Sequence, residues 1–449
     1  MRVAVVGLGK IGLPLAVQYA ASGAEVIGLD VDRRVVDSVA AGREPFPGEH
    51  GLAGALASVV DAGRLRATSD PVVAIGAAEV VVVVVPLVVG DDGAPDFRAM
   101  DAATDSVGRA LAPGTLVAYE TTLPVGTTRR RWVPRLEAAS GLVHGRDFDV
   151  VFSPERVLTG RVFADLRRYP KLVGGLSSRG AARACAFYER VLQFDERSDL
   201  GRPNGVWDLG SAEAAELAKL AETTYRDVNI ALANEFAVFA EREGIDVDVV
   251  IDACNSQPYS HLHRPGIAVG GHCIPVYPRL YLWNDPGASV VSAARHRNAA
   301  MPAYAVDVLE RLHGGLDGQR VVVLGASYRG GVQETAFSGV FGTVAALRAH
   351  GAVPTVSDPL YADAALVAMG LPPHRPGSPV DAVVVQADHR EYAQLGEDAF
   401  PGVRTVLDGR RVLDAARWPS TTIGFVGAPP VVPSDVPSVA PSVVPPAAP

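Results

Sequence analysis

The chain has 449 residues, more than one hydrophobic core normally organises, so two or three domains are expected. Its 41 Lys and Arg residues face 50 Asp and Glu residues, a formal charge of -9 that argues against nucleic-acid binding. The three cysteines, Cys185, Cys254 and Cys273, form no CxxC pair, which argues against a disulfide framework or a structural zinc site and fits a reducing cytoplasm.

The first 200 or so residues alternate short Val-rich runs with helical patterns, which predicts a doubly wound α/β sheet. Strands are predicted at residues 3–6, 25–29, 80–85, 115–119, 149–152 and 171–173. The apolar run at 80–89 contains Pro86 and is too short to cross a membrane, so it is predicted to be a buried strand. With no targeting segment visible at the start of the chain, we expect a cytoplasmic protein without a membrane partner.

A glycine fingerprint, Gly7-Leu-Gly-Lys-Ile-Gly12, follows the first predicted strand and precedes an Ala-rich helix. Gly7 permits a tight turn, Gly9 lets the backbone approach a pyrophosphate, and Gly12 allows the helix to pack closely on the sheet. The N–H groups at the start of that helix favour an anion, so Lys10 and Ile11 join the three glycines as predicted dinucleotide contacts.

Asp30 ends the second predicted strand, where a carboxylate can accept hydrogen bonds from both ribose hydroxyls. The same carboxylate would repel a 2′-phosphate, so NAD is favoured over NADP. Arg33 and Arg34 keep NADP open as an alternative, and a helix-end role for both is equally expected. Arg33 is therefore included among the predicted cofactor contacts.

The pattern changes between Ser211 and Glu243, where Ala, Glu, Leu and Lys dominate and Pro and Gly are absent. One long helix is predicted there, which could act as a spine and a dimerisation surface. A second α/β unit begins near Gln319, with strands predicted at 320–325, 352–357 and 382–386.

The predicted fold is therefore two Rossmann-like, doubly wound α/β domains joined by a central helical domain. The predicted boundaries are 1–205 for the dinucleotide-binding domain, 206–310 for the helical domain and 318–427 for the second α/β domain. Residues 428–449 are mostly Pro, Val, Ser and Ala without periodicity, which predicts a disordered tail.

The segment at 264–276, Arg-Pro-Gly-Ile-Ala-Val-Gly-Gly-His-Cys-Ile-Pro-Val, places Cys273 directly after Gly270, Gly271 and His272. A thiol can add to an aldehyde, and the thiohemiacetal can lose a hydride to give a thioester that water opens. Beside a dinucleotide site, this pattern suggests oxidation of an alcohol to an acid on one enzyme. The alternative is a buried structural cysteine in a Gly-rich turn. His272 has no cluster of potential ligands around it in the sequence, so no metal site is expected.

Four further segments accompany this cysteine: Glu120-Thr-Thr-Leu-Pro-Val-Gly-Thr127, Ser153-Pro-Glu-Arg-Val-Leu-Thr-Gly160, Ala215-Glu-Leu-Ala-Lys-Leu220 and Tyr225-Arg-Asp-Val-Asn-Ile-Ala-Leu-Ala-Asn-Glu235. In this order they resemble the UDP-glucose/GDP-mannose dehydrogenase family over roughly residues 1–425. The resemblance implies an NAD-binding domain, a central dimerisation domain and a C-terminal domain that binds the nucleotide end of a UDP-sugar. It also implies a homodimer and a four-electron oxidation of a sugar CH2OH to a carboxylate with two NAD per turnover.

The resemblance also assigns roles to single residues. Cys273 matches the family's nucleophile, and Lys219 matches the lysine that stabilises alkoxide and oxyanion character. Thr122 matches the threonine that orders the water, and is also a predicted cofactor contact. Glu155 matches a candidate base for thioester hydrolysis. Substrate contacts are expected from Lys219 and Glu155. Further substrate contacts are expected from Arg156, Gly270, Gly271, His272, Tyr328 and Arg329.

Structural roles remain open for three of these residues: a solvated charge for Lys219, a helix cap for Glu155 and a turn residue for Thr122. Three local sequences resemble the branch of the family that acts on UDP-N-acetylhexosamines: Pro154–Val157, Arg226–Ala231 and Gly-Gly-His-Cys-Ile-Pro at 270–275. UDP-N-acetylmannosamine is the first choice of substrate and UDP-N-acetylglucosamine the second. UDP-glucose or GDP-mannose, a two-electron dehydrogenase that stops at the aldehyde, and a non-catalytic nucleotide-sugar-binding protein are the alternatives.

The chain departs from the family pattern near the predicted site. Thr223 stands where the family usually carries Asn, and Tyr277 where it carries Asp, two residues thought to organise the lysine and the water. Leu87 replaces the threonine of Val-Pro-Thr-Pro, and Ala336 replaces the usual arginine. Arg329 could pair with a diphosphate or form a surface salt bridge. Since Cys273 and the other matched catalytic residues are present, a divergent but working enzyme is expected.

Overall fold

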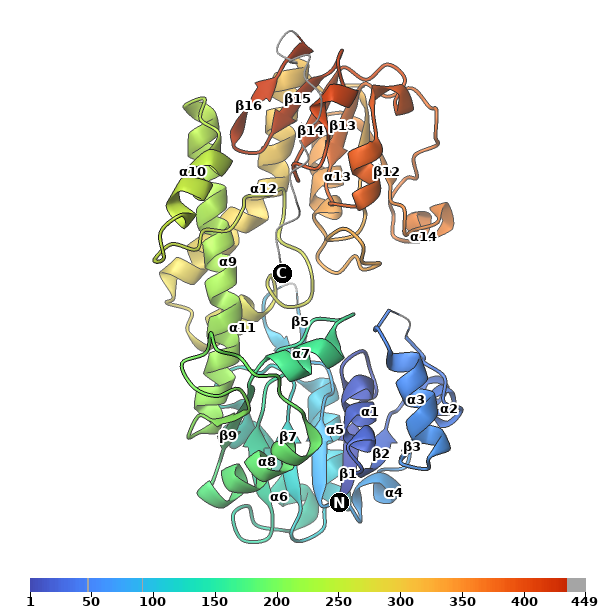
Figure 1. The fold of residues 1–449 in the computed structure, drawn as a ribbon, viewed down its shortest axis with the longest axis vertical. Coiled ribbons are helices and arrows are strands. Elements are labelled where there is room, and N and C mark those ends of the chain that lie inside the picture. Colours follow the sequence, from blue (N-terminus) through green and yellow to red (C-terminus); the bar gives the residue numbers. More distant parts are fainter. Residues whose placement is uncertain (47, 91, 434–449) are drawn as a thin grey trace. The chain divides into compact units, whose positions relative to one another are not determined.

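The computed structural model describes residues 1–433 except 47 and 91 (Figure 1). The chain divides into two compact units, one of Met1–Glu222 with Arg279–Pro286, the other of Thr223–Pro278 with the chain from Gly287 onward. Each unit is built around a mostly parallel β-sheet, which confirms the predicted α/β class. The further division into three domains stays a prediction.

The sheet of the first unit has eight strands in the order β10-β9-β8-β7-β4-β1-β2-β3. Its strands are β1 (Arg2–Val6), β2 (Glu25–Leu29), β3 (Leu65–Thr68), β4 (Val80–Val83), β7 (Leu116–Tyr119), β8 (Asp149–Phe152), β9 (Lys171–Gly175) and β10 (Val206–Asp208). Neighbours in this sheet are parallel except β8 and β9, which run antiparallel. The short strands β5 (Val88–Val89) and β6 (Pro95–Asp96) pair separately.

Helices of the first unit pack on both faces of this sheet (Figure 1). They are α1 (Gly12–Ala21), α2 (Arg33–Ala40), α3 (Leu52–Asp61), α4 (Pro71–Ile75), α5 (Arg98–Ala110), the π-helical turn η1 (Thr128–Trp132), α6 (Val133–Ser140), α7 (Val162–Arg168) and α8 (Ser178–Val191). In β1, Val3 and Val5 join the core formed with α1 and α8, whereas Ala4 joins the core formed with α5 and α6. Because the strands are buried on both faces, their sequences are continuously apolar.

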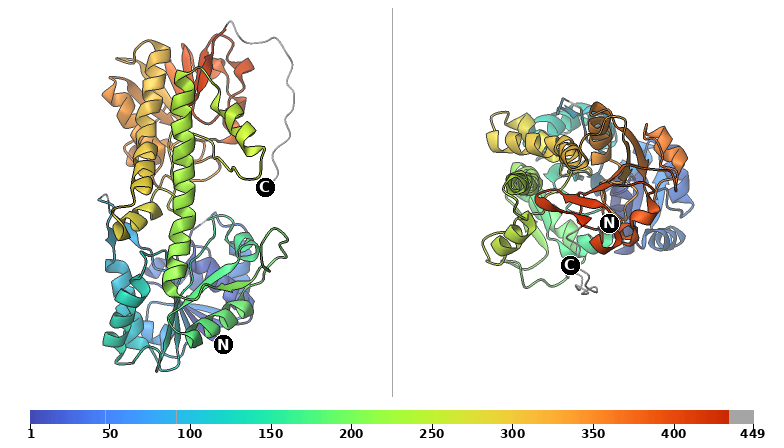
Figure 2. Two further views of the ribbon diagram at one scale, coloured as in Figure 1. Left: turned by 90° about the vertical axis from the view of Figure 1, so that its left-hand side faces the viewer. Right: turned by 90° about the horizontal axis from the view of Figure 1, so that it is seen from above.

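Helix α9 (Ala212–Arg242) is the long helix predicted at 211–243, and it continues from the first unit into the second (Figure 2). The remaining helices are α10 (Val247–Asn255), α11 (Tyr277–Asn284), α12 (Ser289–His313), α13 (Gly339–Ala349) and α14 (Asp363–Ala368), with 3-10 turns η2 (Arg390–Gln394), η3 (Glu397–Ala399) and η4 (Ala415–Arg417). Cys185 and Cys254 lie in α8 and α10. No helix within the described residues is both long and apolar enough to cross a membrane.

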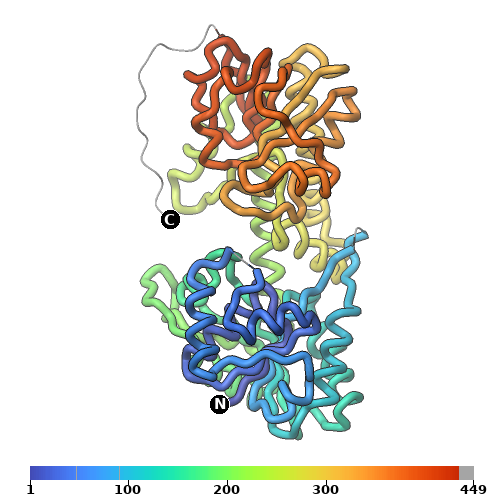
Figure 3. Tube along the Cα trace, turned by 90° about the vertical axis from the view of Figure 1, so that its right-hand side faces the viewer, coloured from blue at the N-terminus to red at the C-terminus, as the bar shows by residue number. Residues whose placement is uncertain are grey.

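The second sheet has six strands in the order β12-β11-β13-β14-β15-β16, and the chain that forms it is traced in orange and red in Figure 3. Its strands are β11 (Arg320–Leu324), β12 (Val353–Ser357), β13 (Ala382–Val385), β14 (Thr405–Asp408), β15 (Thr422–Phe425) and β16 (Ala428–Val431). Val321 and Val323 of β11 join the core with α12 and α13, whereas Val322 joins the core with Phe400 and Trp418. The sheet is therefore covered on both faces.

The prediction of a disordered tail from residue 428 is wrong for its first residues. Ala428–Val431 forms β16, which pairs antiparallel with β15, the one antiparallel pair described in this sheet. Gly427 supplies the positive φ of 80° that a tight hairpin turn requires. Pro429 and Pro430 are tolerated because β16 is an edge strand, where missing N–H donors break no ladder. The predicted tail beyond residue 433 lies outside the described residues.

Candidate active site

In the first unit, the predicted functional residues follow the ends of neighbouring strands. Gly7 follows β1, Asp30 follows β2, Thr122 comes shortly after β7, and Glu155 comes shortly after β8. Since these four strands run parallel, their carboxyl ends meet at one edge of the sheet. Ligands of open α/β sheets bind at this edge, so the structure gathers these residues where such chemistry takes place.

The glycine turn has the geometry of a pyrophosphate cradle. Gly7 has a φ of 92°, and its N–H donates to the carbonyl of Leu29 at 2.8 Å. A Cβ on Gly12 would lie 1.9 Å from the carbonyl oxygen of Gly7, so the helix start tolerates only glycine. A Cβ on Gly9 would meet no atom within 4 Å, which leaves room for a ligand.

Helix α1 begins without a side-chain cap. Its N-cap residue is Ile11, and no side chain accepts from its first N–H groups. Unsatisfied N–H groups and the helix dipole together favour an anion at this point. Lys10 is an exposed residue of the same turn, where its charge adds to that preference. These residues fit the pyrophosphate of NAD.

Asp30 is held in place by two backbone N–H groups. Its Oδ2 accepts from the N–H of Leu8 at 2.8 Å, and its Oδ1 accepts from the N–H of Asp32 at 2.9 Å. A carboxylate has about four acceptor positions, so this side chain retains capacity for ribose hydroxyls. Arg34 pairs with Asp32, the N-cap of α2, at 2.8 Å, which is the helix-end role. Arg33 is exposed on the same turn.

A buried lysine, which sequence reasoning missed, lies beside Glu155. Lys171 is the first residue of β9, and its ammonium contacts the carboxylates of both Glu155 and Glu120, at 3.1 Å for Glu120. The ammonium also donates to the carbonyl of Ser153 at 3.4 Å and lies 4.6 Å from the ring centre of Tyr188. The available signal was a lysine opening an apolar strand, because buried lysines are rare unless paired.

Glu120 is the most deeply buried carboxyl of this group. Its Oε1 accepts from the hydroxyl of Tyr188 at 2.5 Å and from that of Tyr19 at 3.3 Å. Burial raises the pKa of Glu120 to about 8, although the charge of Lys171 acts in the opposite direction. Burial would also raise the pKa of Glu155, but the charge of Lys171 and a hydrogen bond from Glu120 bring it below its usual value.

Lys219 belongs to the same electrostatic environment. It is a buried residue of α9, and its positive charge further lowers the pKa of Glu155. Arg156, the residue after Glu155, donates to Glu222 of α9 at 2.9 Å and lies over the ring of Tyr169. Lys219 thus acts electrostatically on Glu155, and α9 holds Arg156 through Glu222.

A second residue that sequence reasoning missed connects α9 to the segment after β7. The buried carboxylate of Glu216 accepts from the N–H of Gly126 at 2.5 Å and from the N–H of Thr128 at 2.9 Å. Burial raises the pKa of Glu216 to about 7 in spite of these bonds. The bonds fix the loop that carries Thr122 to the helix that carries Lys219.

In the second unit, the structure brings two predicted contacts together. A Cβ on Gly270 would lie 2.5 Å from the Cβ of Tyr328, and one on Gly271 would lie 3.2 Å from its ring. Gly271 has a φ of 91°, and its N–H donates to the carbonyl of Ala336 at 2.8 Å. The paired glycines are therefore needed for close packing against the loop after β11.

Cys273 is a partly exposed free cysteine whose carbonyl accepts from the N–H of Tyr277 at 2.9 Å. This bond places the thiol in the turn that opens α11. Nε2 of His272 lies 3.3 Å from a carboxylate oxygen of Glu334, on an exposed face of the loop. Within the described part of the chain, no group of three or more His, Cys, Asp or Glu side chains could hold a metal ion.

The side chain of Arg329 has one buried nitrogen, Nε, without a hydrogen-bond partner among the described residues. Its guanidinium lies 5.7 Å from the ring centre of Tyr328. An unsatisfied buried donor costs about 1–3 kcal/mol, and more when charged, so an anionic ligand here would remove a penalty. The described contacts of Arg329 include no salt bridge, the other role open from the sequence.

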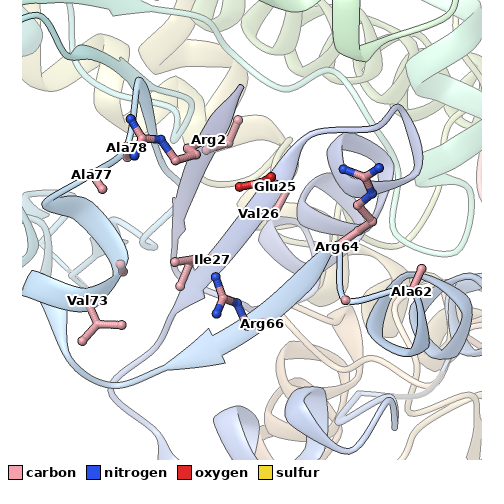
Figure 4. A pocket seen from close by; sticks show the side chains of 13 residues that line it. Arg2, Glu25, Val26, Ile27, Ala62, Arg64, Arg66, Val73, Ala77 and Ala78 are labelled. Atoms are coloured by element: carbon pink, nitrogen blue, oxygen red, sulfur yellow. The ribbon is translucent and has the colours of Figure 1, made fainter.

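A cavity of about 480 Å³ opens at the opposite edge of the first sheet (Figure 4). Its lining includes Arg2 and Glu25, the first residues of β1 and β2, and Arg64, which precedes β3. These are the amino ends of the strands, whereas ligands of open α/β sheets bind beyond the carboxyl ends. The cavity is therefore not part of the candidate active site.

Known proteins resemble the chain along most of its length. Residues 1–192 match the NAD binding domain of the UDP-glucose/GDP-mannose dehydrogenase family, and residues 213–299 match the central domain of that family. UDP-N-acetyl-D-mannosamine dehydrogenase of Pyrococcus horikoshii is 33% identical over 425 residues, covering 92% of this chain and 96% of that protein. NDP-N-acetyl-D-galactosaminuronic acid dehydrogenase of Ralstonia nicotianae is 30% identical over 437 residues, covering 92% and 97%.

A solved structure agrees with these sequence matches. The structure of the UDP-D-ManNAc dehydrogenase from Pyrococcus horikoshii has a TM-score of 0.84 to this chain at 30% identity. It covers 97% of this chain and is itself covered over its full length, 100%. The similarity therefore extends through both units.

Proposed function

The chain belongs to the UDP-glucose/GDP-mannose dehydrogenase family and is an NAD-dependent nucleotide-sugar dehydrogenase, and we propose that it oxidises C6 of a UDP-N-acetylhexosamine to the carboxylate. UDP-N-acetylmannosamine is the proposed substrate, because relatives named UDP-N-acetyl-D-mannosamine dehydrogenase align with nearly the whole chain. UDP-N-acetylglucosamine, UDP-glucose and GDP-mannose are the alternatives. The observation that carries the proposed chemistry is the buried Glu155 within the field of Lys219.

NAD, when bound, would supply the hydride acceptor, one NAD for each of the two oxidation steps. Gly7, Gly9 and Gly12 would leave room for its pyrophosphate at the start of α1, and the Asp30 carboxylate would accept hydrogen bonds from its ribose. Further cofactor contacts are proposed for Lys10, Ile11, Arg33 and Thr122.

The residues of the chain carry the substrate through two oxidations and a hydrolysis. In the first, the C6 hydroxyl passes its proton to solvent water, the ammonium of Lys219 stabilises the alkoxide that forms, and C6 gives up a hydride to the bound NAD. The thiolate of Cys273 then adds to the aldehyde carbon, and loss of a second hydride from this thiohemiacetal leaves a thioester. Glu155 takes a proton from water, whose oxygen attacks the thioester carbon, and the departing thiolate regenerates Cys273.

The nucleotide end of the substrate is proposed to bind in the second unit. Arg329 offers a buried unpaired Nε to a diphosphate oxygen, and Tyr328 is fixed beside it by Gly270 and Gly271. Substrate contacts are also proposed for His272 and Arg156.

A homodimer is proposed through α9. This helix exposes the large apolar side chains of Tyr225, Leu232, Phe236 and Phe239, spaced so that they share one face. Exposed apolar stripes of this kind mark association surfaces. Measurement of the molar mass in solution tests this proposal, and a monomer at micromolar concentration would contradict it.

The proposed reaction is tested by counting the NADH formed per mole of limiting sugar nucleotide. UDP-N-acetylmannosamine, UDP-N-acetylglucosamine, UDP-glucose and GDP-mannose are compared under the same conditions. Two NADH per sugar from one acetamido substrate support the proposal. One NADH with a trapped aldehyde supports the two-electron alternative, and no NADH while NAD binds supports a nucleotide-sugar-binding protein.

A further inference from the structure

The buried pair of Lys171 and Glu120 has no direct part in the proposed reaction, yet it is built into the catalytic edge of the first sheet. Its placement follows from one reversal of strand direction. Strand β9 runs antiparallel to β8, with Gly174 opposite Phe152, so the beginning of β9 lies beside the residues that follow β8. Lys171 therefore reaches the edge at which Glu155 stands.

The three ionisable side chains of this cluster, Lys171, Glu120 and Glu155, have little contact with water. The side chains of Lys171, Glu120 and Glu155 are 4%, 0% and 10% exposed. Unpaired charges at such depth are strongly unfavourable, so the protonation states of the three groups are tied to one another.

One ammonium faces two carboxyl groups in this cluster. The other titratable groups around it are the phenols of Tyr19 on α1 and Tyr188 on α8, and Lys219 on α9. Both phenols donate to Glu120, and burial raises the pKa of each, so they stay neutral. Two adjacent buried carboxylates repel, and the pair therefore keeps one proton.

That proton resides on Glu120. Glu120 is the deeper of the two carboxyls, and burial raises its pKa to about 8. Burial would also raise the pKa of Glu155, but the positive charges of Lys171 and Lys219 help to bring it below its usual value. At neutral pH the cluster then holds an ammonium, an ionised Glu155 and a neutral Glu120. The net charge of the buried group is zero, which is the arrangement a dry site favours.

We propose that Lys171 and Glu120 are positioning residues that keep Glu155 ionised and fixed in orientation, so that it can take a proton from the hydrolytic water. This inference rests on the proposed function. The ammonium of Lys171 engages Oε1 of Glu155, and Glu120 hydrogen-bonds to the same carboxylate, so both residues fix its orientation. Neither residue touches the reacting atoms, and both act through Glu155.

The pH profile of kcat tests this assignment with Lys171→Met and the matched control Lys171→Arg. Without the ammonium, the pKa of Glu155 rises, because no neighbouring charge of Lys171 favours the ionised form. The acid limb of the K171M profile should therefore move to higher pH by about one unit or more. The guanidinium of K171R keeps the charge and should restore the wild-type limb. An unmoved limb in K171M, or a limb that K171R fails to restore, would overturn the assignment.

Glu120→Leu provides a second variant that retains the lysine. Glu120 is neutral over the acid limb, and its hydrogen bond lowers the pKa of Glu155, so the loss of this donor in E120L should move the acid limb to higher pH. Glu120→Gln keeps a side-chain donor and should keep the limb near its wild-type position. If E120L leaves the limb unmoved, Glu120 has no influence on Glu155 and the proposal fails, even when K171M does not fold.

Two readouts separate a failure of this inference from a failure of the proposed function. In a single turnover, K171M should release two NADH per active site and then accumulate an acyl-enzyme detectable by mass. Infrared absorption of protonated carboxyl groups needs no substrate. At pH 7 one buried protonated carboxyl should disappear in E120Q and a further one should appear in K171M. A wild-type protein that makes no NADH would contradict the function, whereas unchanged infrared bands would contradict the role of Lys171.

Discussion

The two sheets carry the same glycine turn and use it differently. In the first unit, Gly7 donates to the carbonyl of Leu29, and the next N–H donates to Asp30, each at 2.8 Å. In the second, Gly325 donates to the carbonyl of Ser357, and the next N–H donates to Asp358, again at 2.8 Å. The backbone arrangement after the first strand is thus repeated in detail.

The difference lies in what the aspartate faces. Asp30 is partly exposed, whereas Asp358 is buried and lies 3.2 Å from Nε2 of the buried His389. The imidazole takes up an acceptor position of this buried carboxylate. A Rossmann-like turn can bind a dinucleotide only when its carboxylate remains accessible to the ribose. The buried carboxylate of Asp358 is not accessible, so the turn of the second sheet does not provide such a site.

The largest expected effect separates the chemistry of the two units. Cys273→Ser should lower steady-state turnover by on the order of a thousandfold or more, because serine is a much poorer nucleophile at neutral pH. NAD affinity, measured by calorimetry, should stay at the wild-type value, because the cradle lies in the first unit. Slow accumulation of an ester-linked intermediate is the most turnover that we expect. Unchanged turnover would sink covalent catalysis through this residue.

A matched pair of glycine substitutions sharpens the comparison of the turns. Gly9→Val places its side chain in the open cradle, so NAD affinity should fall roughly ten- to hundredfold, a steric cost of about 1–3 kcal/mol. Gly325→Ala instead meets the Cβ of Ala387 at 2.4 Å and has a φ of 109°, so it should destabilise the protein. G325A should leave the dissociation constant of NAD unchanged, and weaker binding by G325A would contradict the division of roles.

The two aspartates give the next largest effect. Asp30→Asn should weaken NAD binding about tenfold, because charge-assisted hydrogen bonds to ribose are weakened, and should reduce the preference over NADP. Asp358→Asn should lower the unfolding temperature and leave NAD affinity unaltered, since its partners are His389 and backbone N–H groups. Equal losses of NAD affinity in both variants would refute the comparison.

The smallest effect is a pH dependence of stability. The pKa values of Glu120 and Glu216 are raised by burial, to about 8 and about 7. Their contribution to stability is fully present below their ordinary pKa and is lost as pH rises through 7 and 8. The unfolding temperature should therefore decrease from pH 6 to pH 9, and Glu216→Gln should flatten that decrease. An identical slope in E216Q would show that Glu216 does not titrate in this range.

The opposite slope is expected from Asp358 in the second unit. Burial would raise the pKa of Asp358, but the hydrogen bond from His389 and the backbone N–H groups bring it below its usual value. The stability that it contributes is present above its ordinary pKa and is lost as pH falls through the lowered value. This contribution of Asp358 to the stability is therefore lost only in strongly acidic solution.

Local patterns made much of the fold predictable. Strand β2 lies at the predicted residues 25–29, and α9 ends within one residue of the predicted helix, because apolar runs and helix-forming composition are properties of the chain itself. Strands such as β10, β14 and β15 were missed. They have only three or four residues each, too few for a periodic signal.

The electrostatics of the site could not be predicted in the same way. Glu120 meets Lys171 across 51 residues of sequence, and Glu216 meets Thr128 across 88. Whether a charged residue is buried and paired depends on strand order and direction, and no local pattern carries that information. The glycine fingerprint could be predicted from the sequence, because its turn, its helix start and its acidic residue all belong to one β-strand–helix–β-strand unit.

Strand β16 also protects the molecule from association through the edge of its second sheet. An exposed edge strand offers a row of N–H and C=O groups on which another chain can assemble. Pro429 and Pro430 remove two of those donors, and the hairpin at Gly427 lays them over the otherwise open side of β15. A chain cut before Ala428 would bare the apolar sequence Thr-Ile-Gly-Phe of β15, and aggregation would then compete with folding.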